Sequence, residues 1–356
     1  MNYLAICLSY LVIAALAPRS ALADPGGVAT SPSAPAPMAP PPANHLDPST
    51  VRPGASPEQS AAETERYWTK ERMDHAKPLD MWQRSPRPAA STEGAPASQL
   101  WAPNIPYELP RYSSGYLPSS DYSPAVGRIY FTTPQGDFVC SGTVVAPNLV
   151  ITAAHCVYDA SDRNGTGYYS NWRFAPSQIG ASLPYGLWSA RKAIVWPYYY
   201  TVADPDSQQP GFGPMDYAFL VFDPSNGVNL GGLVGSYGLL INSPGGAKFN
   251  QGYPAAGSFA KYCQGSYCYI WYCSSPVGYY DLDYDRWYEV GMGCYNNGGA
   301  SGGPWFENYG GVWYVSSVNS TAEFLSPQTK ETYGSNIFGP YLNDYALYLH
   351  QYSQGQ

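Results

Sequence analysis

The chain has 356 residues, more than the roughly 100 to 200 of a usual single domain, which favours two domains or one domain with a tail. Charged residues are only 12% and the net charge is −8, so the chain lacks the basic surface that nucleic-acid binding requires. Hydrophobic residues at 44% supply a core, which excludes a wholly disordered chain.

The N-terminus is typical of an exported protein. Residues 4–17 are apolar, and Ala21 and Ala23 supply the small-residue pattern that signal peptidase cleaves. The run is too short for a membrane anchor, which needs about 20 apolar residues. We therefore expect a signal peptide over 1–23, a secreted product and no membrane partner after cleavage.

Residues 24–120 are predicted to form a proline-rich leader, or propeptide. They carry 18 of the 35 prolines and no cysteine. The tract 24–57 lacks large apolar groups and is expected to stay disordered. Ser60 and Glu63 match a capping box, which predicts one helix ending before Pro78 and no other folded element before residue 100.

Residues 121–356 have the pattern of an all-β sandwich or barrel, because short apolar runs alternate with Gly, Pro, Asn and Ser. Leu342, Tyr345, Ala346 and Leu349 have helical spacing and predict a short C-terminal amphipathic helix. The expected strands are 126–132, 148–152, 193–196, 217–222 and 312–318.

Six cysteines remain after signal cleavage, an even number that in an oxidising compartment predicts up to three disulfides rather than a metal site. A hairpin would bring Cys140 to Cys156, and we expect that pair. The residues alone do not decide how the other four cysteines pair.

Two histidines lie in this region, and we interpret His350 as structural because nothing around it indicates a site. His155 differs, since it follows an apolar strand through small residues that leave room around its ring. Asp216 opens a very apolar strand, and a buried carboxylate there would need a partner such as a histidine.

Ser301 lies between glycines in the segment 298–304, Gly-Gly-Ala-Ser-Gly-Gly-Pro. A nucleophilic serine needs a tight turn whose amides can face a developing oxyanion, and glycines permit both. A flexible linker is the alternative, but it does not explain the apolar run Pro304-Trp305-Phe306 that follows.

These three blocks together resemble the signature segments of the trypsin and chymotrypsin-like serine endopeptidases, in the same His, Asp, Ser order. The likeness covers roughly 125–350. It is closest to the secreted glutamyl-endopeptidase-like branch of bacteria and fungi, and implies a chymotrypsin-like double β-barrel with the site between the barrels. The segments that carry the resemblance are 67–73, 140–145, 152–158, 216–220, 252–254 and 299–304.

The resemblance implies that Ser301 is the nucleophile, that His155 is the general base and then acid, and that Asp216 orients His155. The backbone amides of Gly299 and Ser301 would form the oxyanion hole. It also favours disulfides Cys263–Cys294 and Cys268–Cys273, and it implies no metal or other cofactor.

The same resemblance places the specificity pocket at Tyr295 and Asn296, with walls from Ser317, Val318 and Asn319. Ser317 would begin the substrate-binding strand and face the triad. None of these residues is charged, which predicts a neutral residue before the cut. A glutamate preference is the alternative, although the histidine that this branch uses for it is missing near Ser316.

We expect the substrates to be proteins or peptides and the enzyme to be a monomer. Two other classes of protein remain as alternatives. One is an inactive protease-like binding module. The other is an α/β-hydrolase, whose Ser-Asp-His order would require His350 as base with too few residues after Ser301 to complete that fold.

Overall fold

The computed structural model describes residues 50–84, 113–116, 123–202, 211, 213–243, 245–263, 268–281, 288–294, 296–323 and 336–356. All of them belong to one unit, residues 37–356. The expected signal peptide, most of the Pro/Ala tract and Tyr295 lie outside the described residues.

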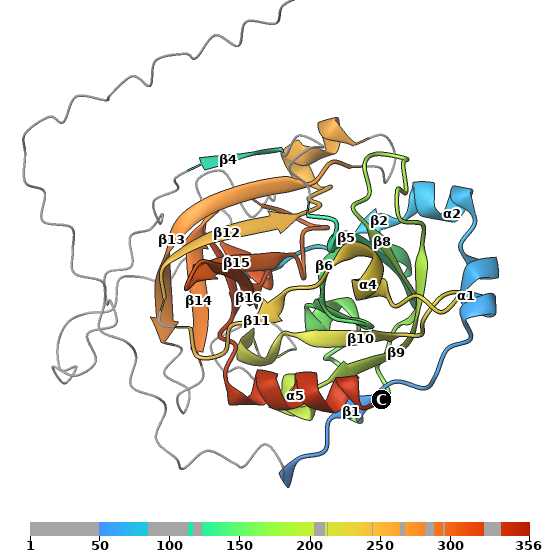
Figure 1. Ribbon diagram of the computed structural model, residues 1–356, viewed down its shortest axis with the longest axis horizontal. Coiled ribbons are helices and arrows are strands. Elements are labelled where there is room, and N and C mark those ends of the chain that lie inside the picture. The colour runs from blue at the N-terminus through green and yellow to red at the C-terminus, as the bar shows by residue number, and fades with distance from the viewer. Residues whose placement is uncertain are drawn as a thin grey trace, which may run out of the picture. The chain divides into compact units, whose positions relative to one another are not determined.

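The first sheet closes into a barrel (Figure 1). Its strands run in the order β5-β6-β7-β10-β9-β8, and β8 pairs with both β9 and β5. Apolar side chains from every strand fill its interior, and Ile129, Val150 and Phe219 have no exposed surface. The strands are β5 (Val126–Thr133), β6 (Gly136–Ala146), β7 (Leu149–Thr152), β8 (Ser170–Pro176), β9 (Trp188–Val195) and β10 (Ala218–Phe222).

The second sheet follows in the chain and has the order β11-β16-β15-β12-β13-β14-β18-β17-β3, with β4 also pairing with β13. The all-β prediction is therefore confirmed. The strands are β11 (Gly238–Leu239), β12 (Ala247–Gly252), β13 (Trp271–Asp281), β14 (Tyr288–Gly293), β15 (Pro304–Tyr309), β16 (Val312–Val318), β17 (Thr321–Glu323), β18 (Asn336–Pro340) and, from the leader, β3 (Trp82–Arg84) and β4 (Ser113–Tyr116).

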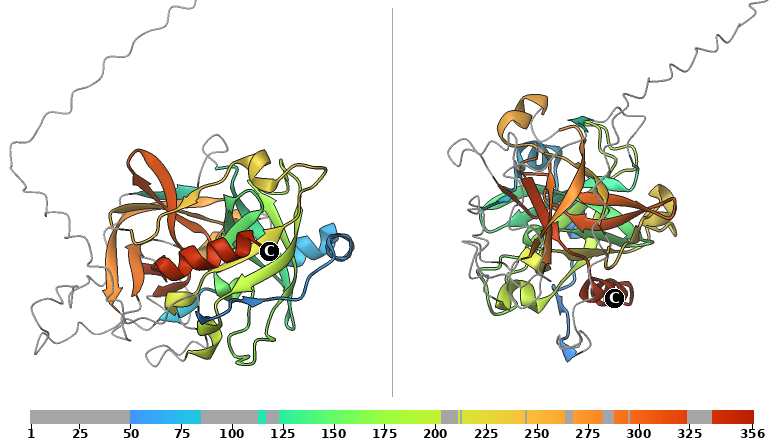
Figure 2. Two further views of the ribbon diagram at one scale, coloured as in Figure 1. Left: turned by 60° about the horizontal axis from the view of Figure 1, so that its bottom comes forward. Right: turned by 90° about the vertical axis from the view of Figure 1, so that its left-hand side faces the viewer.

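Short helices connect or cover the strands. α3 (Pro197–Thr201), η4 (Gly213–Met215), α4 (Leu230–Val234) and η5 (Gly257–Tyr262) lie in connections, and η3 (Ala154–Cys156) follows β7. The predicted C-terminal helix is confirmed as α5 (Asp344–Gln354), which buries Tyr345, Ala346 and Leu349. Figure 2 shows α5 beside β9 and β10, where the Trp196 Nε1–H donates to the Tyr345 carbonyl at 3.1 Å.

The leader has more structure than we expected. Ser60 caps α1 (Ala61–Tyr67) as predicted, but the helix breaks, and Thr69 caps a second helix, α2 (Lys70–His75). The break occurs because Trp68 turns onto the first barrel, where its Nε1–H donates to the Asn171 carbonyl at 2.5 Å.

The expectation of one folded element before residue 100 is wrong. Two short leader strands pair with the first barrel, because backbone hydrogen bonds to an existing sheet need no large apolar side chains. These strands are β1 (Gly54–Ala55), antiparallel to β9, and β2 (Lys77–Pro78), parallel to β6. Among the described residues no helix is long and apolar enough to cross a membrane.

Buried tyrosines predict a loss of stability in alkali. Burial raises the pKa of Tyr199 and Tyr217 well above the ordinary value of about 10. In the unfolded chain both ionise near that ordinary value, so above it the unfolded state holds fewer protons than the folded state. The contribution of these two tyrosines to the free energy of unfolding should be constant below about pH 10 and fall as the pH rises further.

Urea unfolding at a series of pH values measures this decline. Replacing Tyr199 and Tyr217 with phenylalanine should make it shallower, although loss of the hydroxyls can lower stability at every pH. A slope that the two substitutions leave unchanged would rule out these tyrosines as its cause.

Candidate active site

Strand pairing brings His155 and Asp216 together. His155 follows β7 and Asp216 precedes β10, and these strands are antiparallel neighbours with Thr152 opposite Ala218. The His155 Nδ1 lies 2.7 Å from Asp216 Oδ2, and the His155 backbone N–H donates to Oδ1 at 2.9 Å. Each of the two residues is only 2% exposed, so this hydrogen-bonded pair is shielded from solvent.

The contacts of Asp216 fix the form of the imidazole. An ionised carboxylate only accepts hydrogen bonds, which assigns the proton to His155 Nδ1 and leaves Nε2 as the basic nitrogen. A third donor, the Ser320 hydroxyl, reaches Asp216 Oδ2 at 2.5 Å. The carboxylate is thereby held by three donors and cannot rotate away from the ring.

The loop that carries Ser301 packs against the segment leading to His155. The Ser141 N–H donates to the Ser301 carbonyl at 2.7 Å, and the Thr152 hydroxyl donates to the Ser141 carbonyl at 2.8 Å. A disulfide between Cys140 and Cys156 joins the neighbours of Ser141 and His155. Ser301 is fully buried, and its Oγ has no hydrogen-bond partner within the part of the chain that the structure describes.

Ser141 also fixes the backbone at Gly299. Its Oγ donates to the Gly299 carbonyl and accepts from the Tyr253 N–H, each at 2.9 Å. Gly299 has a φ of +92°, and a Cβ there would lie 2.7 Å from the Tyr253 carbonyl oxygen. A glycine is therefore required at this position, where the expected oxyanion-hole amide lies.

The described residues that we expect to line the specificity pocket differ in what their side chains contact. Asn296 is buried and donates to Asn250 Oδ1 at 3.1 Å. Val318 is buried in the core. Asn319 donates through Nδ2 to the Ala300 carbonyl at 2.8 Å, so it holds the loop that carries Ser301.

Ser317 does not face the triad. The Ser317 hydroxyl donates to the Pro340 carbonyl at 2.8 Å. The serine that contacts Asp216 is Ser320 instead. The reason is that β16 continues to Val318 and the chain then turns into β17. Ser320 lies at that corner, and the residues before it in the sequence do not show where the strand ends.

The family model described as Trypsin matches residues 114–178. A thermostable serine protease, AL20, from an extremophilic microorganism shares 29% identity, with a TM-score of 0.52 over 66% of this chain and 98% of that one. Protease Anisep from Arthrobacter nicotinovorans shares 25% identity, with a TM-score of 0.53 over 68% of this chain and 100% of that one.

The family match and these two solved structures support a trypsin-like serine protease. A Glu endopeptidase solved in complex with MPD has the same fold, with 18% identity and a TM-score of 0.51 over 68% of this chain and 97% of that one. These likenesses confirm the chymotrypsin-like fold prediction. A curated Bacillus subtilis (strain 168) protein described as an extracellular metalloprotease is 38% identical over 61 residues, which are 17% of this chain and only 18% of that protein.

The description of that relative raises the question of a metal. Within the described ranges, the His, Cys, Asp and Glu side chains close enough to share an ion are those of Cys140, His155 and Cys156. The two sulfurs are joined in a disulfide, whereas a cysteine binds a metal ion as the free thiolate. This set of side chains therefore does not fit a metal ion.

The disulfides of this protease are partly as expected. The pair Cys140–Cys156 is confirmed, with a Cα–Cα distance of 6.3 Å. The other two expected pairs are wrong, because the bonds are Cys263–Cys268 and Cys273–Cys294. Cys273 on β13 lies beside Cys294 at the end of the paired strand β14, with 5.7 Å between their Cα atoms, so strand pairing selects this partner.

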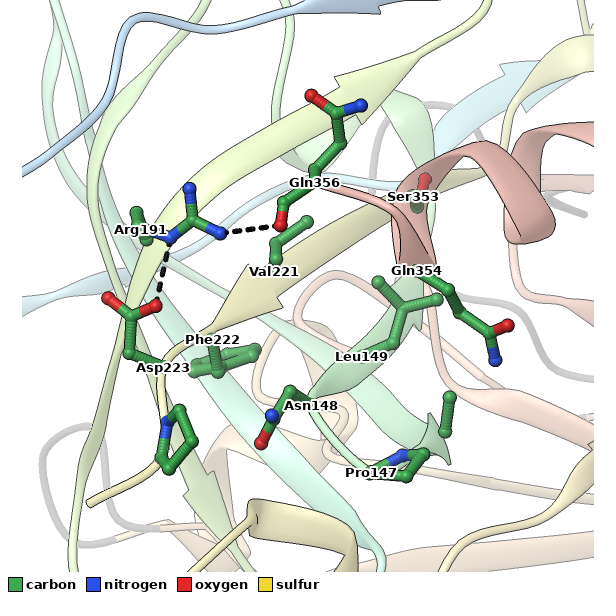
Figure 3. Close-up of a pocket in the computed structure, with 12 residues that line it drawn as sticks. Pro147, Asn148, Leu149, Arg191, Val221, Phe222, Asp223, Ser353, Gln354 and Gln356 are labelled. Atoms are coloured by element: carbon green, nitrogen blue, oxygen red, sulfur yellow. Dashed lines mark hydrogen bonds and ion pairs between the residues drawn. The ribbon is translucent and has the colours of Figure 1, made fainter. Parts of the chain in front are cut away.

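A separate pocket of about 480 Å³ lies on the first barrel beside the C-terminus (Figure 3). Arg191 crosses its rim, donating to Asp223 Oδ1 at 3.0 Å and to the Gln356 carbonyl at 2.9 Å. No residue of the expected catalytic set lines it. The charged groups at its rim already pair with each other, so it carries no sign of a second site.

Proposed function

We propose that this chain is a secreted serine endopeptidase that hydrolyses proteins or peptides through Ser301, His155 and Asp216. The observation that carries the proposal is the hydrogen-bond chain from Ser320 through Asp216 to His155 Nδ1, next to the Ser301 loop. This arrangement supplies a base whose tautomer and orientation are fixed, which a hydroxyl nucleophile requires.

The reaction follows from these positions. His155 Nε2 takes the Ser301 hydroxyl proton while Oγ attacks the scissile carbonyl, and the amides of Gly299 and Ser301 stabilise the oxyanion. The imidazolium then gives its proton to the leaving amine, which forms an acyl-enzyme. Water, deprotonated by His155, attacks the ester, and collapse of that intermediate returns the proton to Ser301 and releases the acid.

The proposal includes processing of the chain. The signal peptide would direct export of the chain and be cleaved after residue 23. Removal of the leader, residues 24–120, would then give a mature monomeric enzyme that begins shortly before Val126. Val126 is fully buried in β5, where it pairs with Thr143, so a cleavage point must lie before it.

We also propose a neutral preference at the residue before the cut. Burying an ionised side chain without an opposite charge is costly, and the residues expected to line the pocket carry no charge. They are Tyr295, Asn296, Ser317, Val318 and Asn319. Glu289 is a buried carboxylate in the same sheet, but its side chain lies against Gly213. Because side chains alternate along a strand, it lies on the face of β14 opposite to that of Val290 and Met292.

A proteome-derived peptide library tests activity and preference together. The processed protein should cut it, and kcat/KM should be at least about tenfold lower for Glu, Lys or Arg before the cut than for the best uncharged residue. Ser301→Ala is the control and should leave the library intact. Cleavage mainly after Glu or after Lys and Arg would overturn the neutral preference, and binding without cleavage would favour an inactive binding module.

A further inference from the structure

One segment of the leader lies across the candidate active site. β2 pairs in parallel with β6, so that Pro78 lies opposite Val139, and the Leu79 N–H donates to the Val139 carbonyl at 3.1 Å. The Leu79 carbonyl then accepts from the Gly299 N–H at 2.9 Å. This amide is one of the two donors assigned to the oxyanion hole, so a leader carbonyl occupies it.

The next apolar residue of the leader is buried against the second sheet. Met81 is only 1% exposed. It packs in a cluster with Cys294, which precedes the expected pocket base, and with Ala322 and Ile337, which face each other across β17 and β18. The other members of the cluster are Cys273, Val290, Met292, Trp305 and Tyr341.

The leader then pairs with the strand that follows Ser320. β3 runs parallel to β17, with Trp82 opposite Thr321 and Arg84 opposite Glu323. Ser320 donates to Asp216, and β17 begins at the next residue. β3 therefore adds a strand to the sheet directly after a residue that contacts the expected triad.

We propose that residues 77–84 are an internal inhibitor, in which Met81 fills the primary specificity pocket and the Leu79 carbonyl occupies the oxyanion hole. This inference rests on the proposed endopeptidase function and goes further, because it identifies the ligand of the site in the unprocessed chain. It also assigns the pocket walls to Cys294, Ala322 and Ile337 rather than to Ser317, Val318 and Asn319.

The register explains why this segment inhibits and is not cut. In a productive substrate one residue must both fill the pocket and present its carbonyl to the oxyanion hole, since the bond after that residue is the one cleaved. In the leader the carbonyl belongs to Leu79 and the pocket side chain to Met81, two positions later. Among the described residues the Leu79 carbonyl accepts from Gly299 and no bond joins it to the Ser301 N–H, and the side chain that fills the pocket is not its own, so the Leu79–Asp80 bond is not held as a scissile bond.

The occupant also indicates what the pocket accepts. A flexible, unbranched thioether fills a socket of apolar side chains without a buried charge. A substrate with Met or Leu before the cut would make the same contacts, whereas Glu, Lys or Arg would lose hydration there. We therefore narrow the proposed neutral preference to unbranched or γ-branched aliphatic side chains.

Labelling of Ser301 by a fluorophosphonate in the intact full-length chain tests the inhibition. Wild type and Met81→Asp are compared, and intact mass separates unprocessed from processed chains. A carboxylate in the apolar socket should release the segment, so unprocessed Met81→Asp should label at least about tenfold faster, because reactivity follows the fraction of open sites. Met81→Leu, which keeps an apolar side chain of similar size in the socket, should label as slowly as wild type.

Equal labelling rates in unprocessed wild type and Met81→Asp would overturn the inference. If Met81→Asp misfolds, Met81→Ala serves instead and should label faster than Met81→Leu. The proposed function fails in a different way, since then neither the unprocessed nor the processed chain labels at Ser301.

Peptides that differ only at the residue before the cut test the pocket assignment. Processed enzyme should give a kcat/KM for Met or Leu at least about tenfold above that for Ala, Glu or Lys. Ala322→Phe, which narrows the assigned socket, should reduce cleavage after Met more than cleavage after Ala. An equal effect on both peptides would contradict the assignment of Met81 to this pocket.

Discussion

Replacing Ser301 with alanine, His155 with alanine or Asp216 with asparagine should each lower kcat by about 10⁴-fold or more on a peptide ester. In Asp216→Asn the new amide nitrogen would donate to His155 Nδ1, which moves the ring proton to Nε2. Nε2 could then no longer accept the proton of Ser301. Because the three groups act as a unit, a double variant should be little worse than the more severe single variant.

The control for Asp216→Asn is Asp223→Asn. Asp223 lies beyond the other end of β10, where it pairs with Arg191 on the surface, and its loss should leave kcat unchanged. The processed forms of all variants should keep the Cys140–Cys156 disulfide, which shows that the barrel has formed. Retention of more than a few per cent of activity by Ser301→Ala would show that another residue is the nucleophile.

Local sequence patterns predicted the parts of the site that depend on a few adjacent residues. The small residues before His155 and the glycines around Ser301 each define a short turn with its own backbone requirements. The capping box at Ser60 predicted the start of α1 for the same reason, since Ser60 Oγ accepts from the Glu63 N–H three residues later. These features need no distant contact to be recognised.

Contacts between distant segments could not be predicted in this way. Met81 and Ala322 belong to one buried cluster although most of the chain separates them, and nothing near Met81 in the sequence distinguishes it from an exposed leader residue. The low apolar content of the leader predicted disorder, yet a few anchors such as Trp68 and Met81 suffice when strands of the barrel supply the backbone partners. The pairing of the last four cysteines likewise depends on the register of β13 and β14.

Gly302→Ala should lower kcat/KM by at least about 10²-fold, because it displaces the nucleophile. Gly302 has a φ of +77°, and a Cβ there would lie 2.1 Å from Thr152 Oγ1 and 2.5 Å from the Ser141 carbonyl oxygen. The threonine side chain could rotate, but the Ser141 carbonyl belongs to the backbone of β6 and cannot yield. The Ser301 loop must therefore move away from His155.

Gly310→Ala is the matched control for this substitution. Gly310 also has a positive φ, +62°, but a Cβ there would meet nothing within 4 Å, so the variant has backbone strain without a clash. Steady-state kinetics and urea unfolding on both variants separate the two effects. Gly310→Ala should lose only stability, of the order of 1 kcal/mol, whereas Gly302→Ala should lose activity as well. Adding Thr152→Ala to Gly302→Ala should not restore activity, because the clash with the Ser141 carbonyl remains, and full rescue would show that the threonine side chain alone fixes the loop.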